Sequence, residues 1–241
     1  DDYAEPDYLE LMYRKIVSKD ADVCVCSAAR EDVKKNKIFV EKRLLDFSLV
    51  PDKEVFSYKD IPKDFFQFTN TVAWNKMFKR DLIVNNNLSF QEIERCNDYF
   101  FVYASLVKAN KITTVDKVLY TQRINHGINL HSALYKSPFC FLEASSKLHD
   151  WLVKENKYND LQDSFIKAFI KLSNYNILRF KDYKNIYIDA FNMVRQKLEE
   201  YNVRSRLDSL QNACLKRVAK IFLEQTAEHR YKEIIRSYDK K

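Results

Sequence analysis

The chain has 241 residues, of which 46% are hydrophobic and 31% are charged, and it carries a formal net charge of +7. This length and apolar content are enough for a sizeable core and exclude a disordered chain, and no apolar run approaches the roughly 20 residues that a membrane-spanning helix needs. A single glycine in the whole chain excludes the glycine-rich loops that cradle phosphate in many nucleotide-binding proteins.

The first part of the chain alternates between predicted helices and strands. Residues 6–19 predict a helix, because a proline suits its first turn and apolar residues recur at helical spacing. Residues 21–26 predict a buried strand. Residues 65–72 predict a loop or strand, and residues 74–85 predict a short helix that ends at a run of three asparagines.

A third predicted helix covers residues 97–110, with Asn97 or Asp98 at or near its N-cap. Two strands are predicted to follow it, at residues 112–115 and 118–122, with a turn between them.

From residue 138 onward, apolar residues recur with a period near 3.6 in several segments, which is typical of packed helices. We therefore expect an α/β part over residues 1–136, followed by an all-α helical subdomain over residues 137–241.

The cysteines favour a reducing compartment. Their number is odd and their positions are scattered, which indicates buried free thiols rather than a disulfide framework or a zinc site. Cys24 and Cys26 alternate within an apolar run, so we expect both on one face of a strand. The set is Cys24, Cys26, Cys96, Cys140 and Cys214.

Four motifs in one order carry a resemblance to a known family. They are Asp1-Asp2-Tyr3 before the helix that starts with Pro6, Trp74-Asn75-Lys76, Asn97-Asp98, and the segment Tyr120 to His131. In this order and spacing they resemble the family 2 glycosyltransferases of GT-A fold, of the type that builds bacterial capsules and surface polysaccharides. The resemblance covers about the first 135 residues. It implies that residues 1–136 are the acceptor half of a Rossmann-like nucleotide-sugar transferase, and that the nucleotide-binding half would precede residue 1.

The resemblance implies inverting transfer of a sugar from a nucleotide sugar, expected to be a UDP-sugar, to a hydroxyl of a growing surface glycan or a lipid-linked glycan. It also implies a location in the cytoplasm at the inner face of the plasma membrane. A homo-oligomer built through the helical subdomain is compatible with this function.

The acidic motif implies a metal site. Asp1 matches the second aspartate of the family's metal motif, and the resemblance gives Asp1, Asp2 and His126 as ligands of Mg²⁺ or Mn²⁺, hard cations that take carboxylate and phosphate oxygens. The alternative is that the two aspartates favour the start of a helix through its dipole and that His126 is a turn residue.

The family's catalytic base matches Asp98, where Asn97 stands in place of the usual glutamate. A carboxylate there can take the proton of the acceptor hydroxyl as the glycosidic bond forms. The alternative, a helix N-cap, is compatible with that role.

Two further groups are implied by the resemblance. Arg123 and Gln122 would bind the diphosphate, since a guanidinium has forked donors that suit phosphate. Trp74, Asn75 and Lys76 would bind the acceptor, with the indole stacking on a sugar ring. The alternatives are that Arg123 is a surface strand residue and that Trp74 belongs to the core.

The end of the chain is basic: residues 204–241 hold ten lysines and arginines against five acids. Basic amphipathic helices can lie on anionic membranes, which predicts a peripheral membrane contact; a solvated cationic face is the alternative. A basic helical binding module for nucleic acid or an anionic membrane surface is the competing function. No helix-turn-helix, RNP or zinc-finger signature is present, so we expect no nucleic-acid partner.

Overall fold

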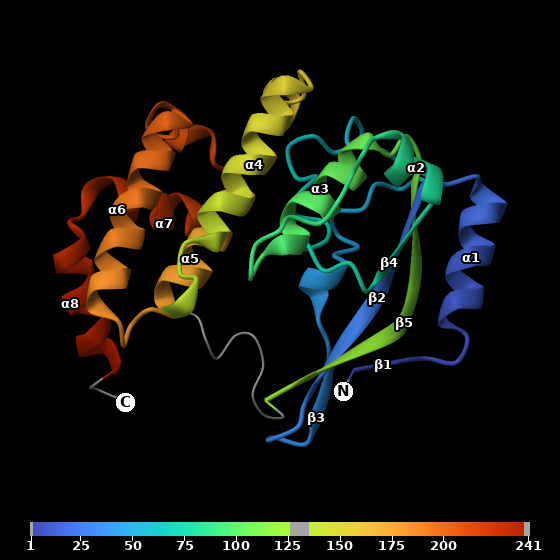
Figure 1. Ribbon diagram of the computed structural model, residues 1–241, viewed down its shortest axis with the longest axis horizontal. Coiled ribbons are helices and arrows are strands. Elements are labelled where there is room, and N and C mark those ends of the chain that lie inside the picture. Colours follow the sequence, from blue (N-terminus) through green and yellow to red (C-terminus); the bar gives the residue numbers. More distant parts are fainter. Residues whose placement is uncertain (1, 126–134, 239–241) are drawn as a thin grey trace. The chain divides into compact units, whose positions relative to one another are not determined.

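A computed structural model describes residues 2–125 and 135–238. The chain forms two compact units (Figure 1). The first consists of Asp1–Glu92, Asn97–Ile128 and Lys147–Ser164, and the second of Ile93–Cys96, Asn129–Ser146 and Phe165–Lys241. Residues 147–164 therefore pack with the α/β part, and the boundary at residues 136 and 137 stays a prediction.

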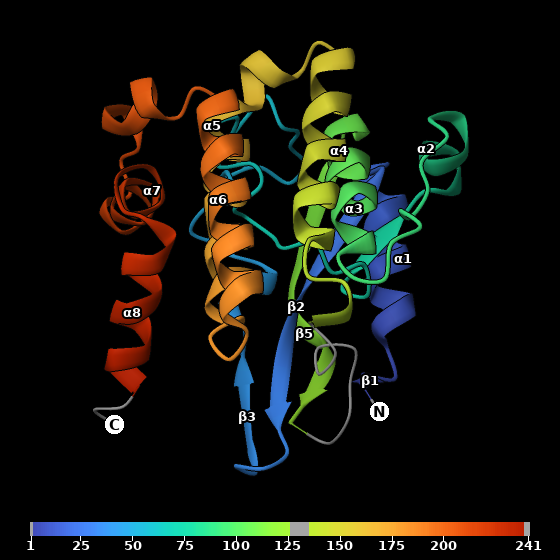
Figure 2. The same cartoon turned by 60° about the vertical axis from the view of Figure 1, so that its left-hand side comes forward.

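A mixed sheet organises the first unit. Its order is β1-β5-β2-β3, with β4 also pairing with β2. The pairing of β2 with β5 is parallel and the other pairings are antiparallel, so the two longest strands form the centre of the sheet (Figures 1 and 2). The strands are β1 Tyr3–Ala4, β2 Val23–Asp32, β3 Lys37–Val40, β4 Lys76–Phe78 and β5 Ile112–Ile124.

Helix α1, Tyr8–Lys19, packs on this sheet. Met12 and Ile16 from the helix meet Cys24 and Cys26 from β2 and Leu119 from β5 in one buried cluster. The predicted helix over residues 6–19 and the shared strand face of the two cysteines are confirmed.

Two predictions about local structure are wrong. Residues 112–122 form one strand, because Val115 pairs with Cys26 and Val118 with Ser27, so the residues between them bulge from β5 instead of turning. The segment 74–85 is not a single helix: it holds β4 and then the short helix α2, Arg80–Asn85. The sequence pattern missed β4 because a three-residue strand is fixed by its pairing partner β2 rather than by its own periodicity.

Helix α3, Asn97–Lys108, confirms the predicted third helix. Every residue from Tyr99 to Val107 is buried, which explains an apolar composition on all sides of the helix. At the two ends of the helix, Asn97 is exposed and Asp98 and Lys108 are half-buried.

From residue 138 onward the described chain is mostly helical, as predicted, and the fold is α/β followed by helices. Helix α6 packs against α7 and α8 in the second unit (Figure 2), and Phe191 contacts Phe222 at a ring-centroid distance of 4.9 Å. The helices are α4 Cys140–Lys154, α5 Tyr158–Leu178, α6 Lys184–Glu200, α7 Ala213–Glu224 and α8 Ala227–Tyr238, and short 3₁₀ turns lie at Lys42–Leu44 and Arg204–Ser209.

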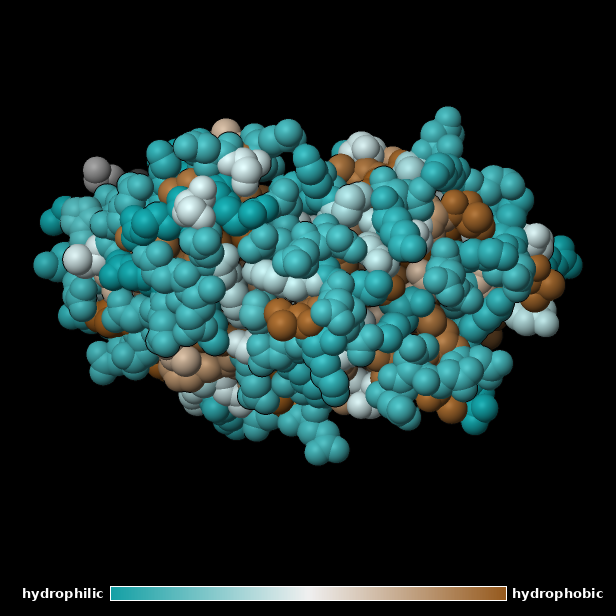
Figure 3. Space-filling model, turned by 90° about the horizontal axis from the view of Figure 1, so that it is seen from above, coloured by the Kyte–Doolittle hydropathy of each residue, from teal (hydrophilic) through white to brown (hydrophobic). Residues whose placement is uncertain are grey.

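Within residues 2–125 and 135–238, no helix combines the length and the apolar character that crossing a membrane requires. The face of the molecule seen in Figure 3 is mostly hydrophilic, and hydrophobic residues occur there in small separate patches.

Candidate functional site

Asp98 lies in the first turn of α3 and is half-buried. Burial raises the pKa of its carboxyl to about 6, and three weaker effects oppose that rise: hydrogen bonds from the backbone N–H groups of Asp98 and Tyr99, and the charge of Lys76. A carboxylate with this pKa is ionised at neutral pH yet basic enough to accept a proton. Asp98 lies one residue inside the helix, which begins at Asn97, and its role as the base stays a prediction.

Lys76, at the start of β4, is 5% exposed. Its Nζ donates hydrogen bonds to the carbonyl oxygens of Asn70 (2.9 Å) and Val72 (2.8 Å) and to Asn75 Oδ1 (2.8 Å). Burial lowers the pKa of the ammonium to about 7, while the charge of Asp98 acts in the opposite direction. The ammonium is therefore held inside the unit by the backbone of the segment that precedes it.

Asn75 is fully buried. Its Nδ2 donates to the carbonyl oxygens of Cys26 (3.0 Å) and Leu44 (3.1 Å), and the latter oxygen also accepts from Thr69 Oγ1 (2.6 Å). Both side chains lie beneath the surface with their polar groups bonded to the protein. The acceptor contacts expected of Asn75 and Lys76 stay a prediction.

Trp74 is half-buried and its ring is stacked on Tyr120, with centroids 4.5 Å apart and an interplanar angle of 19°. The Trp74 carbonyl oxygen accepts a hydrogen bond from the hydroxyl of Tyr8 (2.9 Å). One face of the indole packs against the protein and the side chain remains partly accessible. The contact of Trp74 with an acceptor sugar stays a prediction.

Asp2 is exposed and lies beside the end of β5, because β1 pairs with that strand. Its Oδ1 accepts from the backbone N–H of Arg123 (3.0 Å) and its Oδ2 from the hydroxyl of Tyr120 (3.5 Å). Arg123 Nε lies 3.3 Å from Glu31 Oε2. The side-chain oxygen of Gln122 is buried and has no hydrogen-bond partner among the described residues.

The structure places some of the predicted site residues near one another. Asp2, Gln122 and Arg123 meet where β1 joins β5, and Tyr120 links them to Trp74. Lys76 follows two positions after Trp74, and its charge lowers the pKa of Asp98. Asp1 and His126 lie outside the described residues.

The donor chemistry of Asp2 fits a hard divalent cation, since it offers exposed carboxylate oxygens. Within the described parts of the chain, no group of three or more His, Cys, Asp or Glu side chains is arranged to hold a metal. The described residues thus supply one carboxylate of the site that the sequence predicts with Asp1 and His126.

The sequence analysis missed two tyrosines of this region. Tyr8 bonds to the backbone of Trp74 from the first turn of α1. Tyr103 is buried one turn and a half beyond Asp98 on α3, and its hydroxyl donates to the Phe66 carbonyl oxygen (2.9 Å). In the sequence, each tyrosine only lies on a predicted helix near one of the motifs. That position does not distinguish it from an ordinary core residue.

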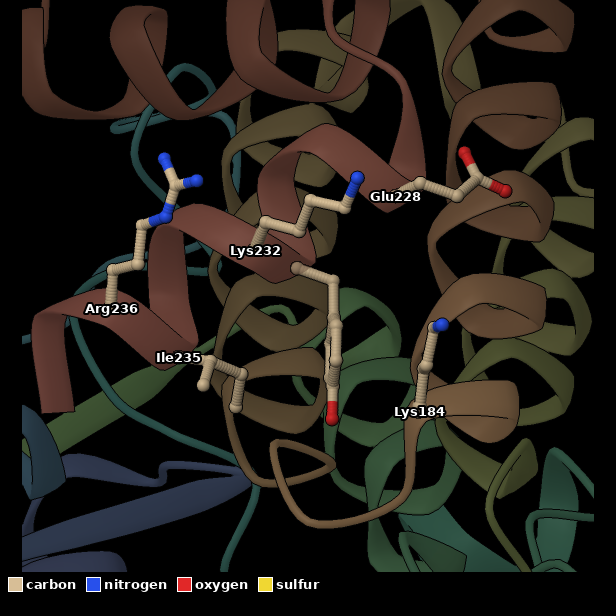
Figure 4. Close-up of a pocket in the computed structure, with 6 residues that line it drawn as sticks. Lys184, Glu228, Lys232, Ile235 and Arg236 are labelled. Atoms are coloured by element: carbon tan, nitrogen blue, oxygen red, sulfur yellow. The ribbon is translucent and has the colours of Figure 1, made fainter. Parts of the chain in front are cut away.

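The helical unit holds a separate basic cavity of about 370 Å³ between α6 and α8 (Figure 4). Three cations line it, Lys184, Lys232 and Arg236, and none has an ion-pair or hydrogen-bond partner among the described residues. Glu228, Tyr231 and Ile235 complete the lining.

No family model matches the chain. In sequence, the chain is 28% identical to the putative glycosyltransferase EpsH of Bacillus subtilis over 171 residues, which cover 63% of this chain and 46% of that protein. It is 26% identical to the cholesterol galactosyltransferase of Borreliella burgdorferi over 206 residues, which cover 80% of this chain and 53% of that protein. The chain is thus similar in sequence to two glycosyltransferases over most of its own length.

Solved structures agree with this relationship at the level of the fold. The fold of this chain matches that of S. aureus TarS 1-349 in complex with UDP-GlcNAc, with a TM-score of 0.64 at 18% identity, over 100% of this chain and 66% of that one. The same TarS fragment in complex with UDP matches with a TM-score of 0.59 at 17% identity. The chain spans about half the length of its two curated glycosyltransferase relatives.

Proposed function

We propose that this chain is the acceptor-side part of an inverting glycosyltransferase, in which Asp98 is the base that deprotonates the acceptor hydroxyl. The observation that carries the proposal is the placement of Asp98: a half-buried carboxyl in the first turn of α3, with its pKa raised to about 6. Inverting transfer needs one base near the acceptor hydroxyl, and a base is most effective when its pKa lies close to the working pH.

The proposed donor is a nucleotide sugar, because the structurally similar TarS fragment has been solved with UDP-GlcNAc and with UDP. Arg123 and Gln122 would contact the diphosphate, with their guanidinium and amide N–H groups as donors to its oxygens. Asp2, with Asp1 and His126, would hold Mg²⁺ or Mn²⁺. A divalent cation there neutralises charge on the leaving diphosphate when it is bound.

The proposed acceptor is a hydroxyl of a surface or capsule glycan. Trp74 would bind its sugar ring, since the indole is partly accessible and is kept in place by Tyr120. For a lipid-linked acceptor, the basic cavity of the helical unit supports a peripheral contact with the inner face of the plasma membrane, because Lys184, Lys232 and Arg236 outnumber Glu228, the one acid among its lining residues.

The test uses the complete protein, a panel of nucleotide sugars, and Mn²⁺ or EDTA. Calorimetry would measure donor binding, and release of the nucleoside diphosphate would measure turnover. We expect metal-dependent donor binding by the wild type and by Asp98→Asn, with turnover lost in Asp98→Asn. Asp81→Asn is the matched control, since Asp81 is an exposed aspartate in the first turn of α2. Absence of donor binding and turnover by the wild-type protein across the panel would overturn the proposal.

A further inference from the structure

We propose that β3 is the interface of a homodimer, in which the free edge of this strand pairs antiparallel with β3 of a second copy of the chain. β3, Lys37–Val40, ends the sheet order β1-β5-β2-β3, and no described strand pairs with its outer side (Figures 1 and 2). The two sheets would then be continuous across the interface. The dimer is independent of the proposed transferase activity, since β3 holds none of the candidate site residues.

Three consecutive apolar side chains lie exposed on this edge strand. Ile38 is 59% exposed, Phe39 is 38% exposed and Val40 is 63% exposed. Natural proteins usually protect a sheet edge with proline, a bulge or charged side chains, because a bare edge pairs with other chains. β3 has no proline, pairs with β2 without a bulge, and has Lys37 as its only charged residue. The edge is therefore open to pairing along its other three residues.

The backbone groups that point away from β2 are those of Ile38 and Val40. The Glu41 N–H donates to the Ala28 carbonyl oxygen (3.1 Å), so these two residues form a hydrogen-bonded pair of the ladder. Hydrogen-bonded and non-hydrogen-bonded pairs alternate in an antiparallel ladder. Phe39 therefore bonds to β2, while Ile38 and Val40 direct their N–H and C=O groups outward. None of these outward groups has a hydrogen-bond partner among the described residues.

The limits of β3 select one register for the dimer. In a symmetric antiparallel pair, outward residues must face outward residues across a two-fold axis. An axis at Ile38 would pair Val40 with Asn36, whose φ of 47° is not that of a strand. An axis at Val40 would pair Ile38 with Lys42, which belongs to a 3₁₀ turn. With the axis at Phe39, Ile38 faces Val40 of the second copy, and both symmetry-related pairs exchange their N–H···O bonds.

The apolar side chains fit this register. Ile38 and Val40 of opposite copies lie directly opposite each other on one face of the joined sheet, and such cross-strand apolar pairs stabilise a sheet. On the other face, Phe39 meets Phe39 of the second copy at the axis. There the Cα atoms of a non-hydrogen-bonded pair are about 4.5 Å apart, so the two rings can pack against each other.

The interface is small, so we expect weak association that depends on protein concentration. A strand of this length buries less than the roughly 1,200 Å² at which standard-size interfaces begin. Lys37 lies opposite Glu41 of the second copy, which avoids a pair of like charges. Arg43 already holds the Glu41 carboxylate at 2.7 Å within each copy. The backbone hydrogen bonds and the apolar pairs therefore contribute most of the association.

The first experiment is disulfide cross-linking of the complete protein in a Cys214→Ser background, because Cys214 is an exposed free thiol. Phe39→Cys places two thiols across the axis, at a Cα separation that a disulfide can span. We expect it to form a covalent dimer at least about tenfold faster than Ile38→Cys, whose two copies lie on a diagonal of about 7–8 Å, beyond the reach of a disulfide. A mixture of Ile38→Cys and Val40→Cys proteins should cross-link, since these positions are opposite.

Val84→Cys is the matched control for random collision, since Val84 is an apolar residue of α2 that is 50% exposed. Cross-linking of Phe39→Cys no faster than that of Val84→Cys would overturn the proposal, and so would faster cross-linking of Ile38→Cys than of Phe39→Cys. Sedimentation over a concentration series gives a second readout. Phe39→Lys puts like charges at the axis and should shift the dimer to monomer. A wild-type protein that stays monomeric throughout the series would remove the dimer.

Hydrogen exchange distinguishes a second copy from any other occupant of this edge. The amides of Ile38 and Val40 should gain protection as the protein concentration rises, whereas the amide of Phe39, which bonds to β2, should be protected throughout. Protection of Ile38 and Val40 that does not change with concentration would show that a segment of the same chain covers the edge, and would exclude pairing between copies.

Discussion

The ring of Trp74 stacks on the ring of Tyr120 at a centroid distance of 4.5 Å, and the hydroxyl of Tyr120 lies 3.5 Å from Oδ2 of Asp2. One aromatic side chain thus joins the proposed acceptor residue to the acidic motif at the start of the chain. Because β1 pairs with β5 at Tyr3↔Thr121 and Ala4↔Tyr120, this connection is fixed by the register of the sheet.

Replacing Trp74 tests the acceptor side of the site. We expect Trp74→Ala to raise the acceptor KM about tenfold while the donor KM stays unchanged, since aromatic stacking contributes about 0.5–1.5 kcal/mol beyond area burial. Trp74→Phe keeps a ring against Tyr120 and should retain most of the affinity. Initial-rate kinetics with each substrate varied in turn would measure both constants, and an equal rise in the donor KM would contradict the assignment.

Asp98 should determine the pH dependence of the reaction. With the pKa of its carboxyl near 6, a base is protonated and inactive at low pH, so kcat/KM should rise through pH 6 and level off above it. Asp98→Asn should reduce kcat/KM by about 10²–10⁴-fold across the range and abolish this limb. Steady-state rates from pH 5 to 8 would check both statements, and a residual limb near pH 6 in Asp98→Asn would assign it to another group.

The sequence predicted those elements whose own residues determine them. The helix that starts after Pro6 and the buried helix α3 have strong local patterns, and the structure confirms both. The short strand β4 and the continuity of β5 through its bulge depend on pairing with β2, about 50 and 90 residues away in the chain, and no local pattern carries that information.

The candidate site has the same limit: the sequence indicates which residue types are present, but not which of their side chains the fold buries. The sequence and its resemblance to known transferases selected Asp98, Trp74 and Lys76, but they did not indicate which side chain would be buried. Asn75 and Lys76 have polar side chains that usually lie at the surface, and only the folded structure shows that β2 and the segment around Leu44 enclose them.

Asp2 should matter for metal-dependent donor binding. Asp2→Asn keeps an acceptor for the backbone N–H of Arg123 but removes the negative charge. We therefore expect the factor by which Mn²⁺ increases donor affinity to be at least about tenfold smaller in Asp2→Asn than in the wild type, with little change in stability. Calorimetry of the complete protein with a UDP-sugar over a Mn²⁺ series would measure it. Asp7→Asn, in the turn before α1, is the matched control. Unchanged Mn²⁺ dependence in Asp2→Asn would remove Asp2 from the metal site.

The basic cavity of the helical unit should contribute to binding of anionic lipid. Each lysine or arginine near an anionic membrane contributes about 1 kcal/mol, so Lys232→Gln/Arg236→Gln should weaken binding to phosphatidylglycerol vesicles by about tenfold or more. Lys34→Gln/Lys37→Gln makes the same change of net charge in the β2–β3 hairpin and serves as control. Vesicle co-sedimentation at several salt concentrations would measure both, and an equal loss in the control would indicate a nonspecific charge effect.

The burial of Lys76 should leave a signature in stability. Its pKa is lowered in the folded state to about 7 from an ordinary value of 10.5, so between these pH values the unfolded chain binds more protons at this residue than the folded one. Stability contributed through this group therefore rises with pH over that interval. Below pH 7 the residue is charged in both states and its burial costs the most. The free energy of unfolding of wild type minus that of Lys76→Met should consequently increase from pH 7 to pH 9.5. Urea denaturation at the two pH values would measure this difference, in which the other titrations largely cancel. A difference that is constant with pH would show that Lys76 keeps an ordinary pKa in the folded protein.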